Sequence, residues 1–200
     1  QRIVFSALRI MAGFLLAAAG GLLLGAAGAR WHGVRVFIDP AMQLIRAMPV
    51  ASFVILALLW VRSANLSVIV SFTHVLPVVY AGVLGGIADT DPKLLEMAKV
   101  YRLPLTARLR YIWLPGIFPP FCESCIAAMG MCWKSGVSAE VIGLPDHSVG
   151  DALYRAKITL STPDVFAWTL VIVLLSAALS AAAAALLRTA KTRLCGEVCV

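Results

Sequence analysis

Charged residues are scarce in this sequence. Asp, Glu, Lys and Arg make up 14% of the 200 residues, whereas hydrophobic residues make up 61%. A soluble domain usually has about 25% charged and about 45–50% apolar residues. This composition excludes an ordinary soluble fold and also intrinsic disorder. The net charge of +7 comes from basic residues scattered among apolar runs, so no basic patch indicates nucleic-acid binding.

Runs without a charged residue are the candidate membrane spans. About 20 helical residues cross the hydrocarbon core of a bilayer. The runs are 10–29, 47–61, 63–88, 111–133 and 165–187, of which 47–61 is short and 111–133 is interrupted by Glu123. The short stretch 135–144 contains Glu140 and is not expected to span the membrane, and partial re-entry is an alternative for it. The sequence therefore predicts an all-α membrane protein, a single polytopic helical bundle over residues 1–200 with five spans.

The distribution of Lys and Arg predicts the orientation of these spans. Basic residues concentrate in segments 30–46 and 89–110 and in the tail after residue 187. Because cytoplasmic loops of membrane proteins are enriched in Lys and Arg, we expect these segments and the C-terminus to be cytoplasmic. The first span then begins outside, so we expect one further helix before it and six in the complete chain.

Small residues recur every four positions on the first span, at Gly13, Ala17, Gly21 and Gly25. Small side chains at this spacing allow two helices to approach closely. The stripe has two interpretations, which are packing within the same subunit or contact with a second copy in a dimer.

The longest segment between spans, 89–115, contains two short helices by its local signals. Asp91 is suited to cap a helix that begins at Pro92. Pro104 ends that helix because the residue before a proline avoids the helical region. A second short helix is expected over 105–112. The pair is either an interfacial element anchored by aromatic side chains or an apolar and basic knob for a cytoplasmic partner.

The spacing of residues in this segment resembles the EAA loop of bacterial ABC importer permeases. That pattern is E-A-A, three residues, G, nine residues and I-x-L-P. The chain follows this spacing without a gap. Met stands where the pattern has its first alanine, and Arg stands where it has glycine. The aligned positions are Glu96, Met97, Ala98, Arg102, Ile112, Leu114 and Pro115. Segments 6–14, 38–49, 139–143 and 166–168 resemble parts of the nitrate/sulfonate/taurine-type permeases.

This resemblance implies a type I ABC importer permease in a bacterial inner membrane. Its partners would be a second permease copy in a homodimer, a cytoplasmic ATPase dimer and an external substrate-binding protein. The matched positions of 89–115 would form the coupling helix that contacts the ATPase. ATP and Mg²⁺ would be bound by the ATPase, because this chain has no G-x-x-x-x-G-K-[ST] loop and no cofactor of its own. The substrate would be a small solute, such as nitrate, a sulfonate, taurine or a thiamine precursor.

Ionisable residues within apolar runs are candidates for the translocation pathway. Glu123 faces either a polar interior or the membrane interface, since a charge within a span is costly. Trp133, Lys134 and Glu140 are expected at the external end of the fourth span. Lys134 would either attract an anionic solute or pair with Glu140.

The remaining candidates for chemistry are weak. Cys122 and Cys125 form a C-x-x-C in an apolar helix with no second pair nearby, which favours packing over metal or redox chemistry. The sequence predicts no metal site and no enzymatic activity. The alternatives are an integral-membrane lipid-modifying enzyme, which needs clustered acids or histidines, and a purely structural membrane subunit.

Overall fold

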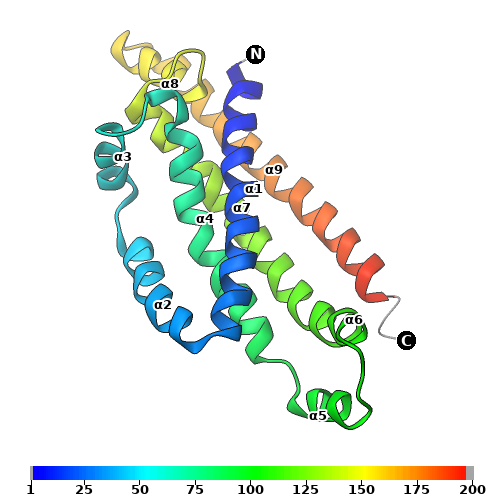
Figure 1. Cartoon of the computed structure of the whole chain (residues 1–200). Helices are drawn as coiled ribbons and strands as arrows, with labels where there is room; N and C mark the ends of the chain where they lie inside the picture. Colours follow the sequence, from blue (N-terminus) through cyan, green and yellow to red (C-terminus); the bar gives the residue numbers. More distant parts are fainter. Residues whose placement is uncertain (1, 197–200) are drawn as a thin grey trace.

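The computed structural model describes residues 2–196, and within that range every regular element is a helix (Figure 1). In chain order the elements are α1 (Arg2–Arg30), α2 (His32–Ala47), α3 (Val50–Leu58), α4 (Ser63–Ala88), α5 (Pro92–Val100), α6 (Leu105–Arg108), a π-helical turn η1 (Leu109–Trp113), α7 (Leu114–Gly143), α8 (Val149–Ile158) and α9 (Thr162–Gly196). The prediction of an all-helical bundle is confirmed.

Within residues 2–196, four helical segments are long and apolar enough to cross a membrane. They are Arg2–Arg30, Ser63–Ala88, Leu105–Gly143 and Thr162–Lys191, and they run side by side in the order α1, α4, α7 and α9. Helices α2 and α3 form a fifth limb that is bent by 102°. The end of α1, α5 and the end of α9 lie at one end of the bundle, and α8 lies at the other (Figure 1).

The fifth limb corrects one sequence prediction. Segment 30–46 was expected between spans, and the short span was expected at 47–61. Instead α2 begins beside the end of α1 and runs back along α4, and α3 follows after the bend at Met48 and Pro49. Counting uncharged residues placed the limb too late, because Arg35 and Arg46 lie within α2.

The stretch 135–144 is also different from the prediction. It does not re-enter the membrane but continues α7 as far as Gly143. Glu140, whose charge argued against a continuous helix, lies fully buried against the start of α8, where its Oε2 accepts hydrogen bonds and its Oε1 has no hydrogen-bond partner among the described residues.

The small-residue stripe on α1 packs against α4 of the same chain. A Cβ atom placed at Gly21 would lie 2.8 Å from the Cβ of Val79, and one at Gly25 would lie 2.8 Å from the Cβ of Val83. Ala17, between them, is completely buried. The close approach of α1 and α4 therefore uses this stripe, which makes packing within the subunit the correct interpretation and leaves no room there for a second copy.

We expect Gly21→Leu to destabilise the folded chain by about 1–3 kcal/mol, the usual cost of overpacking a close contact. Gly33→Leu on α2 is the matched control, since a Cβ at Gly33 meets no atom within 4 Å. Thermal unfolding of the purified protein in detergent measures the difference. Equal melting temperatures for the two variants would contradict the proposed role of the stripe.

Candidate functional site

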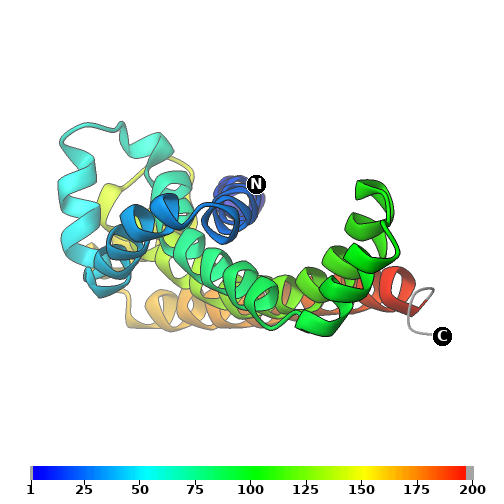
Figure 2. The ribbon, with the colours of Figure 1, turned by 60° about the horizontal axis from the view of Figure 1, so that its bottom comes forward.

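The segment that joins α4 to α7 protrudes from the bundle as two short helices. Asp91 caps α5, because its Oδ1 accepts a hydrogen bond from the backbone N–H of Lys93 at 2.9 Å. Pro92 occupies the first turn of α5, and α6 begins directly after Pro104. The predicted cap, break and second helix are confirmed. Figures 1 and 2 show that this green segment lies away from α2 and α3.

The turn between α5 and α6 requires a left-handed residue, and Arg102 provides it with a φ of 49°. The N–H of Leu103 donates to the carbonyl of Ala98 at 3.1 Å, which closes the end of α5. A left-handed residue after a helix end is most often glycine. The position at which the EAA pattern has glycine therefore has the backbone conformation that glycine favours, although arginine occupies it here.

The side chains of the segment divide into an inner and an outer set. Ala98 is completely buried and Ile112 is 5% exposed, so these two form the inner set. Glu96, Met97 and Arg102 are exposed, and so are four apolar side chains, Leu94, Val100, Tyr101 and Leu105. This apolar surface on a short protruding element has no cover within the described chain.

The second short helix differs from the prediction at its far end. It does not stop before Leu114 and Pro115, because α6 continues through the π-helical turn η1 directly into α7. Pro115 falls in the first turn of α7. The backbone N–H of Leu114 donates to the carbonyl of Leu109, five residues earlier, and Pro115 follows with no N–H to donate. The end of the protruding segment therefore continues into α7 without a break in the helix.

The four residues predicted along the pathway do not gather in one place. The carboxylate of Glu123 lies 3.3 Å from the Nζ of Lys191 near the end of α9. Trp133 is buried and its Nε1 donates to the carbonyl of Ile172 at 3.2 Å. Lys134 is exposed and Glu140 is buried further along the same helix.

Glu140 joins three helices at the end of the bundle opposite α5. Its Oε2 accepts hydrogen bonds from the Oγ of Ser6 at 2.7 Å and from the backbone N–H of Gly150 at 3.4 Å. The Oγ of Ser6 in turn accepts from the N–H of Val149 at 3.0 Å. A carboxylate at a helix N-terminus is favourable. The alternative in which Glu140 pairs with Lys134 is therefore wrong.

Cys122 and Cys125 are buried within α7, as the packing interpretation predicts. Among the residues that the structure describes, no group of three or more His, Cys, Asp or Glu side chains is arranged to hold a metal ion.

The apolar helices of the bundle define a polytopic membrane protein. Residues 17–194 match the family of binding-protein-dependent transport system inner membrane components, and the chain belongs to that family of ABC importer permeases. Its members are permease components and not enzymes, so the lipid-modifying alternative does not hold.

Individual relatives agree with this assignment. The chain is 28% identical over 161 residues, 80% of its length, to a putative aliphatic sulfonates transport permease protein of Bacillus subtilis. It is 26% identical over 157 residues, 78% of its length, to a nitrate import permease protein of Synechococcus elongatus. The matched regions cover 58% and 56% of these two relatives, respectively, so the chain spans little more than half of their length.

A solved structure shares the fold. The crystal structure of an amino acid ABC transporter with histidines superposes with a TM-score of 0.61 at 20% identity, and the match covers 94% of this chain and 91% of that one. The type I importer permease fold predicted from the sequence is confirmed.

We expect Arg102→Gly to keep or raise the stability of the α5–α6 turn, because glycine avoids a left-handed penalty of about 1–2 kcal/mol. Arg102→Val, with a branched side chain at the same φ, is expected to lower it. Hydrogen exchange of the Leu103 amide reports the difference. Faster exchange in the glycine variant than in the valine variant would contradict the assigned turn.

Proposed function

We propose that this chain is the transmembrane permease subunit of an ATP-driven importer for a small solute. The observation that supports this most strongly is the α5–α6 segment, which has the EAA spacing and continues into α7 without a break in the helix. The segment docks in a groove of a cytoplasmic ATPase, and ATPase closure moves α4 and α7 by way of it. The ATPase pair holds ATP and Mg²⁺.

The orientation and the assembly follow from the same proposal. The end of the bundle with α5 is cytoplasmic, and so is the C-terminus, because the basic segments near the end of α1, around α5 and near the end of α9 lie at that end. The opposite end, with α8, receives the solute from an external binding protein. A symmetric ATPase pair needs two coupling segments and each chain has one, so the permease forms a homodimer.

The solute belongs to the class named for the relatives, small anions and sulfonates. Of the four residues expected along the pathway, Lys134 is kept as a candidate because its side chain is exposed. Trp133 and Glu140 are engaged in packing between helices, and Glu123 lies beside Lys191.

Reversing a charge on the α5–α6 segment, which is the proposed coupling segment, tests its role in docking to the ATPase. Glu96→Lys is expected to reduce co-purification of the ATPase at least about tenfold, because an unpaired charge at a docked interface costs about 2–5 kcal/mol. Glu96 is exposed, so folding and membrane insertion should be unaffected. Lys157→Glu, an exposed charge reversal on α8 at the opposite end, is the matched control.

The two variants are compared by pull-down of the ATPase from solubilised membranes and by ATP-dependent uptake. Wild-type retention of the ATPase by Glu96→Lys, together with wild-type uptake, would remove the support for a coupling segment. Ala98→Trp is unsuitable as a docking probe, because Ala98 is completely buried inside the segment and a larger side chain would disrupt the turn itself.

The homodimer is tested on the purified complex. Native mass spectrometry is expected to give two permease chains and two ATPase chains of one kind each. A complex with one copy of this chain and a different second permease would make the homodimer wrong and leave the coupling role unaffected.

A further inference from the structure

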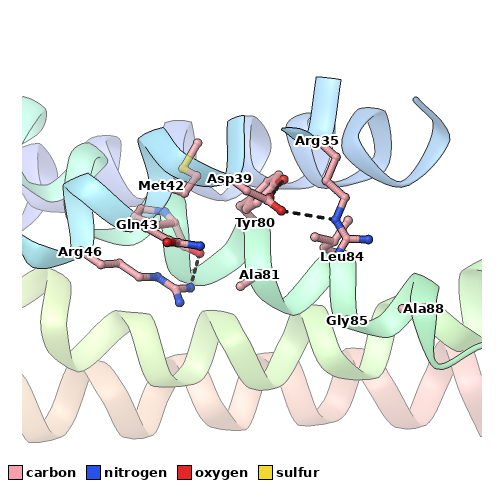
Figure 3. A pocket seen from close by; sticks show the side chains of 11 residues that line it. Arg35, Asp39, Met42, Gln43, Arg46, Tyr80, Ala81, Leu84, Gly85 and Ala88 are labelled. Carbon is pink, nitrogen blue, oxygen red and sulfur yellow. Dashed lines mark hydrogen bonds and ion pairs between the residues drawn. The ribbon is translucent and has the colours of Figure 1, made fainter. Parts of the chain in front are cut away.

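Helix α2 has a polar face that turns toward α4. Its polar side chains, Arg35, Asp39, Gln43 and Arg46, are spaced by four, four and three residues, which places them on one side of the helix. Together with Pro77, Tyr80, Ala81 and Leu84 of α4 they line a cavity of about 300 Å³ (Figure 3). On another side of α2, Phe37 and Leu44 are exposed, as expected of side chains that face lipid.

One end of this cavity is electrically balanced. The Nε of Arg35 lies 3.4 Å from Oδ2 of Asp39, and the hydroxyl of Tyr80 donates a hydrogen bond to the other oxygen of the same carboxylate. The positive charge of Arg35 is thus offset within the cavity, and Asp39 has a partner on each of its oxygens.

The other end carries a positive charge without a carboxylate. Arg46 donates from Nη2 to the backbone carbonyl of Pro77, which is a neutral acceptor. Among the described residues no Asp or Glu forms an ion pair with Arg46. A guanidinium has five N–H donors in a planar fork that matches the oxygens of an oxyanion.

Arg46 also lies near the middle of the bundle's length, although its side chain is exposed. Its partner Pro77 is near the middle of α4, which runs from Ser63 to Ala88. At 1.5 Å per residue the carbonyl is about 16–21 Å from either end of that helix. A positive charge near the middle of a membrane span is costly, and such residues generally mark the path of a solute or ion.

We propose that the cavity between α2 and α4 is an oxyanion site in which Arg46 binds the anionic group and Gln43 contributes amide donors. The inference rests on the proposed function and adds to it a solute contact within the span. A cavity of about 300 Å³ is at the small end of ligand pockets, which suits a small solute. A sulfonate or nitrate solute and the phosphate of a lipid headgroup share this chemistry, and the experiment separates them.

The test uses the full-length permease in complex with its ATPase, without the binding protein. Equilibrium dialysis measures binding of ³⁵S-labelled ethanesulfonate and its competition by nitrate. We expect Arg46→Gln to weaken binding at least about tenfold, since a hydrogen-bonded charge is lost. Arg46→Lys, which keeps the charge without the fork, and Gln43→Leu should each weaken it several-fold. Arg188→Gln, an exposed arginine on α9, is the matched control and should bind as the wild type does.

A second arm measures retention of phosphatidylglycerol by native mass spectrometry in the same variants. Ethanesulfonate binding that depends on Arg46 supports a transported solute. Retention of phosphatidylglycerol that depends on Arg46, without ethanesulfonate or nitrate binding, supports the same oxyanion site with a lipid headgroup in it. Equal binding of all probes by wild type and Arg46→Gln, or no binding of any probe by the wild type, would overturn the site.

The same preparations separate this inference from the proposed function. A complex that retains its ATPase and imports solute, but binds no probe through Arg46, contradicts only the oxyanion site. A permease that retains no ATPase contradicts the proposed function itself.

Discussion

The close packing of α4 against α1 on one side and α7 on the other is the constraint on which the rest of the structure depends. Gly21 and Gly25 bring α1 within contact distance of Val79 and Val83, and on the opposite side a Cβ at Gly86 would lie 2.9 Å from Pro120 of α7. In a lipid environment helices associate through such contacts, because burial of apolar surface offers little gain there. The α5–α6 segment joins the end of α4 to the start of α7. A force applied to it is therefore transmitted to the two helices at the centre of the bundle.

Polar contacts within the apolar bundle are few, and those of Glu140 and Trp133 connect elements far apart in the sequence. Glu140 of α7 accepts hydrogen bonds from Ser6 of α1 and from the start of α8. The indole of Trp133 on α7 donates a hydrogen bond to a backbone carbonyl of α9. Buried polar groups need partners, so each such contact fixes one arrangement of helices rather than several. Arg46 differs from these buried groups, because its side chain is exposed, lines a cavity and donates to a backbone carbonyl.

The long spans and the two short helices α5 and α6 could be predicted from the sequence because they depend on local signals. Uncharged runs locate α1, α4 and α9, and Asp91, Pro92 and Pro104 locate the ends of α5 and α6. Helix α2 and the last turns of α7 could not be found in this way. Their charges, at Arg46 and Glu140, are stabilised by Pro77 and Ser6, residues 31 and 134 positions away, and no local count detects such partners.

The left-handed conformation of Arg102 could not be predicted from the residue type either, because arginine does not favour that conformation. The family spacing alone pointed to it. Gln43 and Tyr80 were not among the predicted site residues, since the cavity they line forms only when α2 lies along α4. The periodic spacing of polar residues from Arg35 to Arg46 was the available signal.

The most direct test of the account is a site-specific cross-link from the coupling segment to the ATPase. In a cysteine-free background, a photoreactive group is attached to a single cysteine at Met97, which is 43% exposed on α5. A second preparation carries the group at Thr159, which is exposed after α8 at the opposite end. The account predicts a cross-link to the ATPase from position 97 and none from position 159. A cross-link from position 159 but not from position 97 would contradict it.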